Sequence, residues 1–393
     1  MTRAASVVLA YGFRPFFLLA SLYAPIIIGA WLCLYTGLWS PPQRWPLFYW
    51  HGHEMIFGFA GAAIAGFLLT AVPSWTETRP VRGLPLAGLA AVWLAGRAAL
   101  WSVDLLPAAA VGAVDVLFFP LLLFAVGPPI ARARKLRNYP VAVLLVLLFG
   151  ANLAMHLQTA GIGGTAIRVS LRLAVYTVVA MVAVISGRIT PLFTQNALRR
   201  RGRDVLVSSN AAVDRLAMLA MLVAMAFDLT SEGSRASAVA WLLAAALMLV
   251  RQWPWRFRDT LSDPIVWILH LSHLWLVVGF AAKGLVPVVG VFPGMTAFHA
   301  LTAGAIGTAV LGVTSRVALG HTGRELRAAP IIVLAYASVL AGAAVRVFGP
   351  LVAPLAYKQT VVVGGSLWAL AFVLFLVHYT PILTRPRPDG QPG

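Results

Sequence analysis

Charged residues are scarce in this sequence. Asp, Glu, Lys and Arg make up 11% of its 393 residues, whereas 60% are hydrophobic and the mean hydropathy is +0.86. A soluble domain carries about 25% charged residues. Apolar runs recur along the whole chain between short polar joints, which excludes a soluble body with a single anchor. The composition therefore predicts an integral membrane protein.

Acidic residues are the scarcest charged type. The 12 Asp and Glu against 30 Lys and Arg give a net charge of +18 and a pI near 11.3. This balance is also typical of nucleic-acid binders. Here, however, the basic residues lie in short joints between apolar runs, where they orient helices in a membrane. We therefore expect membrane lipid as their partner, and no nucleic acid.

Cysteine is almost absent, since Cys33 is the single one. This excludes an intramolecular disulfide, an iron–sulfur cluster, a thiolate zinc site and covalent C-x-x-C-H haem attachment. Any haem would be held non-covalently, as a b-type haem is, through histidine or methionine. The first apolar run, 13–38, is too long for the apolar part of a cleavable signal peptide and predicts a retained helix.

The apolar runs predict an all-α, polytopic fold of about twelve transmembrane helices. A helix needs roughly 17–25 residues to cross about 30 Å of hydrocarbon. The predicted spans are 13–37, 54–74, 84–103, 106–127, 138–159, 168–187, 209–229, 235–251, 264–284, 296–319, 329–348 and 358–379.

Basic residues predict the orientation of these helices. With the N-terminus inside, the inner segments hold eighteen lysines and arginines and the outer joints hold six. This positive-inside bias predicts that both termini face the cytoplasm, which suits a multi-pass protein of a bacterial inner membrane. The chain is expected to form one membrane domain, 1–393. The basic loop 194–208 is a possible divide between two six-helix halves, 1–193 and 209–393.

Four histidines are predicted at the outer ends of three spans. His51 and His53 open the second span, followed by Glu54, and His299 opens a glycine-rich tenth span. Residues two apart lie about 200° apart on a helix, so His51 and His53 reach one site if His51 precedes the helix. His156 shares a helix face with Asn152, four residues earlier. Imidazoles from three helices suit copper or haem iron; the plainer interpretation is interfacial histidines bonding headgroups or loop carbonyls.

An inner layer of polar residues is a weaker signal. His270 and His273 are three residues apart and are able to face one site, whereas His321 and His378 lie near helix ends, where capping explains them equally well. Arginines without nearby acids also gather toward the inner face, and a haem propionate, a phosphate or headgroup contact would neutralise them; these are Arg14, Arg188 and Arg316. Arg97 and Asp115, on adjacent spans, predict an internal ion pair.

Several motifs together resemble the NnrS family over nearly the whole chain. They are Gly12-Phe-Arg-Pro-Phe-Phe17, His51-Gly-His-Glu-Met-Ile-Phe-Gly58, Gly187-Arg-Ile-Thr-Pro191, and the tenth-span stretch that ends in His321-Thr-Gly-Arg324. The family is known as polytopic haem- and copper-containing membrane proteins of bacterial nitric oxide stress and denitrification. Two departures are Glu77, where the family pattern has glycine, and His273, where it has an aromatic residue.

The resemblance implies functional roles for particular residues, and the histidine spacing adds His156 and His270 to them. Cofactor binding is expected at His51, His53, His270, His299, His321, Arg14, Arg188, Arg316 and Arg324. Metal binding is expected at His51, His53, Glu54, His156 and His299. No catalytic residue is assigned, because binding nitric oxide, transforming it and protecting metal centres all fit the resemblance.

Three functions compete at this stage. The first is a haem- and copper-binding membrane protein of nitric oxide resistance, with nitric oxide or a related small molecule as ligand. The second is a haem–copper oxidoreductase similar to nitric oxide reductase; its paired-histidine copper motif on one helix is not found in this sequence, which leaves an analogy of architecture. The third is a secondary transporter, favoured by twelve spans and by Pro25 and Pro120 as helix interruptions.

Overall fold

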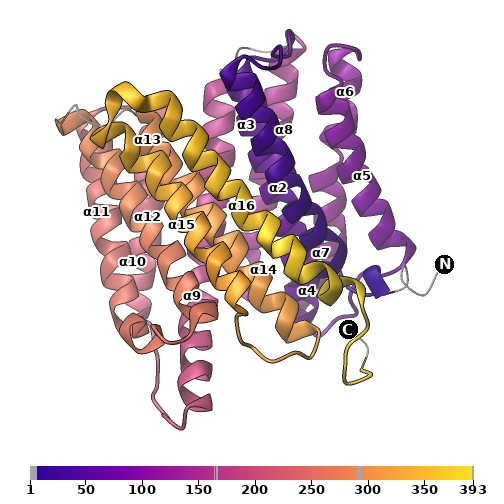
Figure 1. The fold of residues 1–393 in the computed structure, drawn as a ribbon, viewed down its shortest axis with the longest axis vertical. Coiled ribbons are helices and arrows are strands. Elements are labelled where there is room, and N and C mark those ends of the chain that lie inside the picture. The colour runs from indigo at the N-terminus through magenta and orange to yellow at the C-terminus, as the bar shows by residue number, and fades with distance from the viewer. Residues whose placement is uncertain (1–6, 163, 165–166, 290–293, 392–393) are drawn as a thin grey trace. The chain divides into compact units, whose positions relative to one another are not determined.

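A computed structural model describes residues 7–162, 164, 167–289 and 294–391. All regular elements in these residues are helices (Figure 1), which confirms the predicted all-α class. The longer helices are α2 (Phe13–Thr36), α4 (Gly61–Thr76), α5 (Leu84–Trp101), α7 (Phe118–Ala133), α8 (Tyr139–Thr159), α9 (Ile167–Arg200), α10 (Ala211–Thr230), α11 (Arg235–Gln252), α12 (Pro264–Val289), α14 (Gly307–His321), α15 (Pro330–Val352) and α16 (Tyr357–Thr384). Shorter elements extend some of these: α3 (Leu47–His53), η1 (Glu54–Ala60), α6 (Ala108–Asp115), α13 (Gly294–His299) and η5 (Ala300–Ile306).

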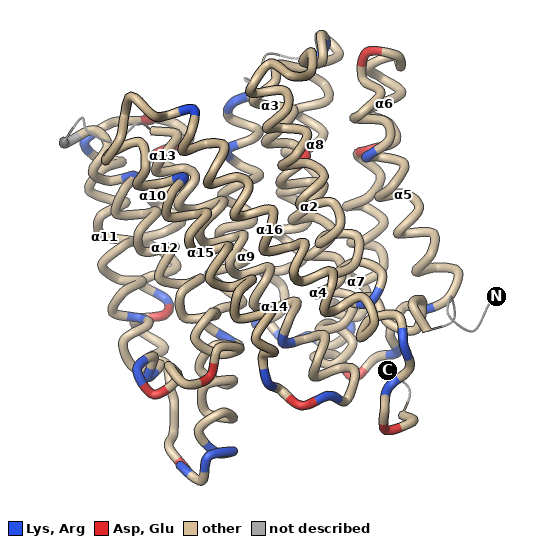
Figure 2. Tube along the Cα trace, viewed as in Figure 1, with Lys and Arg blue, Asp and Glu red and all other residues tan. Residues whose placement is uncertain are grey.

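In the part of the chain that the structure describes, eleven helical segments are long and apolar enough to cross a membrane, and they correspond to eleven of the twelve predicted spans. The predicted span 209–229 is the helix α10, which differs in composition because it carries Asp214, Arg215 and Asp228. Charged residues otherwise lie mostly at helix ends and in connectors, with long uncharged stretches between them (Figure 2). The chain is therefore a polytopic membrane protein, and its orientation stays a prediction. Arg3, which the orientation count includes, lies outside the described residues.

The chain forms two compact units. Unit 1 contains residues 1–178, 317–325 and 376–393, and unit 2 contains residues 179–316 and 326–375. Within unit 1, α2 packs on α4 and η1, α4 packs on α7, and α6 and α7 pack on α8. Within unit 2, α12 packs on α11 and η5, and η5 also packs on α15.

Two predicted helix boundaries are wrong by seven residues or more. The second span begins at Leu47, directly after Pro46, so His51 and His53 lie inside a helix that was expected to start at 54. The sixth span was expected to end at 187, yet α9 continues to Arg200. It ends two residues before Gly202, which has a left-handed φ of 73°. Half of the predicted loop 194–208 is therefore helical, and the two halves 1–193 and 209–393 stay a prediction.

Proline interrupts the fourth span and leaves the first intact. The break between α6 and α7 falls at residues 116–117, and Pro120 follows in the first turn of α7. Proline has no N–H for the carbonyl four residues earlier, so the helix cannot run straight through this position. The break places Asp115 at the end of α6, whereas Pro25 lies inside an unbroken α2.

A pair of π-helical segments occurs at matching places in the second and tenth spans. η1 follows His53 and precedes Gly61, whereas η5 follows His299 and precedes Gly307. A π-helix adds a residue to the turn, weakens the regular hydrogen bonding and is common at functional sites. The second and tenth spans, which both begin with histidine in the sequence, therefore also share an irregular backbone.

Tryptophan side chains bond to the carbonyls of both π-helical segments. Trp93 Nε1 donates a hydrogen bond to the carbonyl oxygen of Gly58 at 3.1 Å, and Trp368 Nε1 donates one to Ala303 at 3.2 Å. Buried carbonyls without partners are costly. The indole donors thus stabilise an irregular backbone inside an apolar bundle.

The described helices form, in chain order, three successive groups of four helical spans with a common pattern. The first span of each group is α2, α8 or α12, and the second spans begin at Leu47, Ile167 and Gly294. Near its end, each second span has an aromatic ring followed by threonine: Trp75-Thr76, Phe193-Thr194 and His321-Thr322. Each threonine hydroxyl donates to the carbonyl four residues earlier, at 2.6–2.8 Å.

Candidate metal centre

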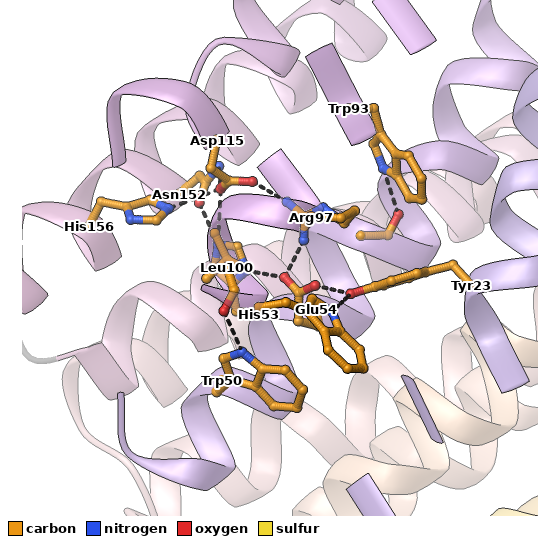
Figure 3. Close-up of polar contacts among 12 residues, drawn as sticks. Tyr23, Trp50, His53, Glu54, Trp93, Arg97, Leu100, Asp115, Asn152 and His156 are labelled. Atoms are coloured by element: carbon orange, nitrogen blue, oxygen red, sulfur yellow. Dashed lines mark hydrogen bonds and ion pairs between the residues drawn. The ribbon is translucent and has the colours of Figure 1, made fainter. Parts of the chain in front are cut away.

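Ionisable side chains from five helical elements, which belong to four membrane spans, meet inside unit 1 (Figure 3). They are His53 from the end of α3, Glu54 from the start of η1, Arg97 from α5, Asp115 from the end of α6 and His156 from α8. All five are buried, with 6% exposure or less. Ionisable groups at such positions in a membrane protein are costly and usually functional.

Arg97 joins the two carboxylates of this cluster. Its Nη1 donates to Glu54 Oε1 and its Nη2 donates to Asp115 Oδ1. The predicted Arg97–Asp115 ion pair is confirmed, and Glu54 is a second anionic partner that the sequence did not reveal. Tyr23 Oη donates to the other oxygen of Glu54, and Trp101 Nε1 donates to Tyr23 Oη at 2.8 Å. The guanidinium is therefore held between two acids by a connected network.

His53 lies between oxygens that accept hydrogen bonds. Its Nδ1 is 3.0 Å from Glu54 Oε1, and its Nε2 is 2.8 Å from Asn152 Oδ1 and 3.2 Å from Asp115 Oδ2. Asn152 Nδ2 donates to Asp115 Oδ2 at 2.9 Å, which fixes the amide with its oxygen toward His53. Oxygen atoms therefore face both ring nitrogens. Arg97 and His53 are the basic side chains that contact the two carboxylates.

Three side chains offer ligand atoms to one metal ion. A ring nitrogen of His53, a carboxylate oxygen of Asp115 and a ring nitrogen of His156 lie within 4.8 Å of one another. His156 Nε2 is 2.9 Å from Asp115 Oδ2, whereas its buried Nδ1 has no hydrogen-bond partner among the described residues. Two imidazoles and a carboxylate are a donor set that copper or iron accepts.

Aromatic rings cover this donor set. The Trp45 ring centroid is 5.1 Å from that of His53 and 5.4 Å from that of His156. The Phe57 centroid is 4.7 Å from that of His53. Trp45 is 3% exposed although it lies in the connector before α3. An apolar cover of this kind limits access of water and strengthens electrostatic interactions inside the cluster.

Glycines allow the helices that carry these side chains to approach one another. A Cβ atom on Gly96 would lie 2.7 Å from Asp115 Oδ1, and one on Gly58 would lie 2.7 Å from Tyr23 Cε1. A Cβ atom on Gly112 would lie 3.1 Å from His156 Cβ. Small residues let helix backbones pack closely in lipid. Here they also make room for a charged network.

The structure separates His51 from His53. Because α3 is helical from Leu47, the two rings leave the helix in different directions. The His51 ring stacks on Trp31 with a centroid distance of 4.2 Å and an interplanar angle of 20°. Both histidines would serve one site only if the chain entered the helix after His51, and this condition is not met. The structure brings together three of the predicted metal ligands, His53, Glu54 and His156.

The predicted site residues of unit 2 occupy separate environments. His299 Nδ1 donates to the Met295 carbonyl at 2.7 Å, a bond that orients the ring. His270 Nε2 is 2.9 Å from Thr194 Oγ1, and Arg316 lies over the Phe193 ring at 3.4 Å from its centroid. Arg188 is half-buried on α9. His270 and His273 do share a face, since both rings contact Trp255.

Three predicted residues lie together near the end of α14 in unit 1. Arg14 Nη1 donates to the carbonyl oxygens of Leu383 and Arg385. The His321 ring contacts Phe13 with a centroid distance of 5.6 Å. Arg324 Nη1 donates to the Thr322 carbonyl at 3.2 Å. These arginines contact carbonyls at helix C-termini, where positive charge is favourable.

From the sequence, Arg97 and Asp115 were predicted as an internal ion pair and were not placed in the metal centre. A signal was present, because two charges in apolar runs mark a functional candidate. However, Arg97 and Asp115 have opposite charges, so each already explained the presence of the other. What it lacked was the packing of α6 on α8, which brings Asp115 to His156.

Comparisons with known proteins agree with the resemblance seen in the motifs. A search of curated proteins finds no match. The family model described as NnrS protein matches residues 7–387, which is nearly the whole chain and includes every residue of the candidate metal centre. The chain therefore belongs to the NnrS family.

Proposed function

We propose that this protein binds copper at His53, Asp115 and His156 and, together with haem, serves in bacterial nitric oxide resistance from the cytoplasmic membrane. The observation that carries the proposal is the buried cluster of two imidazoles and one carboxylate within 4.8 Å. Family membership supports the link to nitric oxide stress. Reduced copper and ferrous haem both coordinate nitric oxide, and an apolar interior concentrates this apolar gas.

The chemistry of the donors fits copper. Imidazole nitrogen and carboxylate oxygen both bind Cu(II), which stands highest in the affinity order of the divalent first-row metals. Metal ligation would require neutral imidazoles, so a bound ion would replace the ring-nitrogen contacts of His53 and His156 with Asn152 and Asp115. Glu54 then acts behind the ligands, because its Oε1 accepts from His53 Nδ1 and orients the ring.

The haem part of the proposal rests on family membership and on His299. The hydrogen bond from His299 Nδ1 to the Met295 carbonyl orients the ring, as such bonds do in histidines that bind a metal through the other nitrogen. The π-helical segment that follows it has the same form as the one after His53. We therefore expect His299 to be a haem ligand, and His270 and His321 are the next candidates.

Metal quantification and an absorption spectrum of the detergent-purified, full-length protein test this function. We expect bound copper and a Soret band in the wild type. His53→Ala and His156→Ala should lose most of the copper, His299→Ala should lose the Soret band, and His378→Ala should retain both. His51→Ala tests whether His51 is a metal ligand, as the sequence led us to expect. Because its ring stacks on Trp31 in the structure, we expect this variant to retain copper. Full copper retention in both His53→Ala and His156→Ala would overturn the assignment.

A secondary transporter is the second candidate, and the buried acids favour it. Glu54 and Asp115 are 0% and 2% exposed, and intramembrane carboxylates of this kind relay protons in transporters. Lys283 pairs with Asp228 at 2.8 Å in unit 2, which adds another buried charge pair. A colourless, metal-free protein that moves a solute into liposomes would favour this function over metal binding.

A further inference from the structure

Arg14 is a fully buried charge close to the start of α2. Its side chain has 0% exposure. Nη1 donates to the Leu383 carbonyl at 2.6 Å and to the Arg385 carbonyl at 3.0 Å. Leu383 lies in the last turn of α16, whose terminal carbonyls have no partners within the helix. One nitrogen of the guanidinium therefore caps the C-terminus of α16.

The other edge of the same guanidinium is unsatisfied. Arg14 Nε and Nη2 are buried and have no hydrogen-bond partner among the described residues. These two nitrogens form the side of the guanidinium that binds two oxygens of a carboxylate or phosphate at once. A buried charged donor without a partner is energetically costly. Such an edge predicts a ligand with two oxygens.

The neighbouring charges have the same sign as Arg14. The positive charges of Arg324 and Arg387 both act on it. Partial burial and the charge of Arg385 lower the pKa of Arg324. The carboxylate that contacts this cluster, Asp389, is already taken, because it bonds Arg387 Nε at 2.9 Å and Nη2 at 2.6 Å. Arg387 thus has its bidentate acid, whereas Arg14 and Arg324 have none among the described residues.

We propose that the Nε–Nη2 edge of Arg14, together with Arg324, binds a phosphate group beside the C-terminal ends of α14 and α16. The cluster contains four arginines, Arg14, Arg324, Arg385 and Arg387, and one acid, Asp389. A phosphate would therefore reduce the excess of positive charge and also bind the open edge of Arg14. This site goes beyond the proposed function, since it uses none of the residues of the metal centre.

The phosphate can come from a phospholipid headgroup or from free phosphate, which offer the same oxygens. A lipid headgroup fits the position of these arginines better than free phosphate does. Arg14 lies at the first turn of an apolar span and Arg385 directly follows the end of another, which is where headgroups meet a membrane protein. Figure 2 shows basic residues in the segment that follows α16.

Arg14→Lys is the sharpest variant for this site. Lysine keeps the positive charge and is able to reach the α16 carbonyls, but it lacks the bidentate edge. Arg324→Gln removes the second charge from a half-buried position. Arg82→Gln, an exposed arginine in the connector before α5, is the matched control for loss of charge. Thermal unfolding in detergent checks that each variant is folded. If Arg14→Lys does not fold, Arg324→Gln still tests the proposal.

Two measurements identify the source of the phosphate. Native mass spectrometry from nanodiscs of phosphatidylglycerol and phosphatidylcholine counts retained lipids, and equilibrium dialysis of the delipidated protein measures binding of inorganic phosphate. We expect one tightly held phosphatidylglycerol in the wild type and in Arg82→Gln. Both site variants should hold it about tenfold or more weakly, as expected when one charge-assisted hydrogen bond is lost.

The possible outcomes decide the proposal. Binding of inorganic phosphate without lipid retention, lost in both site variants, supports the site and assigns it to free phosphate. Equal retention by wild type, Arg14→Lys and Arg324→Gln overturns it, as does a wild type that binds neither probe. Loss of the Soret band in Arg14→Lys with unchanged phosphate binding also overturns it, because the anion is then a haem carboxylate.

Discussion

At the scale of single residues, Asp115 connects more of the candidate centre than any histidine does. Its Oδ1 accepts from Arg97, and its Oδ2 lies 2.9 Å from both His156 Nε2 and Asn152 Nδ2. A carboxylate with four acceptor sites is able to do this, whereas a histidine has two nitrogens. Asp115 is therefore both a candidate metal ligand and a side chain on which the stability of the protein depends.

Asp115→Asn is expected to lose metal and stability together. The change leaves Arg97 with one anionic partner and gives His156 a weaker acceptor. Breaking a buried ion pair costs about 3–5 kcal/mol. Copper content and the thermal unfolding midpoint in detergent measure both effects. The control is Asp104→Asn, an exposed acid that bonds to the backbone of Gln43 and Arg44, for which we expect a change within about 0.5 kcal/mol. Equal effects of the two variants would contradict the central role of Asp115.

The C-terminal Arg387–Asp389 pair gives a prediction for pH. The hydrogen bonds from Arg387 lower the pKa of Asp389 from its ordinary 3.8 to about 2. A carboxyl whose pKa is depressed stabilises the folded arrangement above its ordinary pKa, and this contribution is lost as pH falls through the folded value. The contact should therefore persist at pH 4 and disappear near pH 2. Carboxyl carbon NMR of Asp389 measures its titration midpoint, and Arg387→Gln should move that midpoint back toward 4; an unchanged midpoint would exclude the pair as the cause.

At the scale of elements, the π-helical segment η1 and its glycines bring the charged side chains together. Gly58 lies in η1, and a Cβ atom there would lie 2.7 Å from Tyr23 Cε1 and 3.2 Å from Arg97 Nη1. Both side chains bond to Glu54, so any group added at Gly58 acts on the network directly. An irregular helix and a small residue are thus part of the site, although neither offers a ligand atom.

Gly58→Ala is expected to destabilise the protein by about 1–3 kcal/mol, the usual cost of overpacking. Gly29→Ala is the matched control, because Gly29 lies on an exposed face of α2 with no atom within 4 Å of the added Cβ. Alanine there should be neutral or stabilise by roughly 0.5–1 kcal/mol. Unfolding temperatures of the two variants make the comparison, and Gly58→Ala should also lose copper. A stable, copper-loaded Gly58→Ala would show that close packing at η1 does not matter.

At the scale of the whole molecule, the distribution of charge predicts how the chain sits in the membrane. Basic residues gather in the connectors assigned to the inner side, so both termini should face the cytoplasm. A fluorescent protein fused after residue 391 should fluoresce, and alkaline phosphatase fused there should be inactive. Phosphatase inserted in the connector near Arg44 should be active. The opposite pattern would reverse the orientation, and with it the assignment of outer and inner histidines.

Composition and hydropathy by themselves determined the class of this protein. An apolar run of about twenty residues in lipid has to form a helix, because its backbone hydrogen bonds have no water to satisfy them. The helix count and most boundaries therefore follow from the sequence, as does the Arg97–Asp115 pair, since two opposite charges in adjacent apolar runs have few other partners. The family was evident as well, because its motifs recur in order along the chain.

Tertiary structure decided which of these residues form the site. The sequence placed His51 and His53 side by side, but a helix that begins at Leu47 turns their rings apart, so His53 joins Asp115 and His51 joins Trp31. Glu54 acquired its partners in the same way, through the packing of η1 on α2 and α5. The physical reason is that hydropathy sets the depth of a residue in the membrane, whereas the direction of its side chain depends on where its helix begins and on which neighbours pack against it.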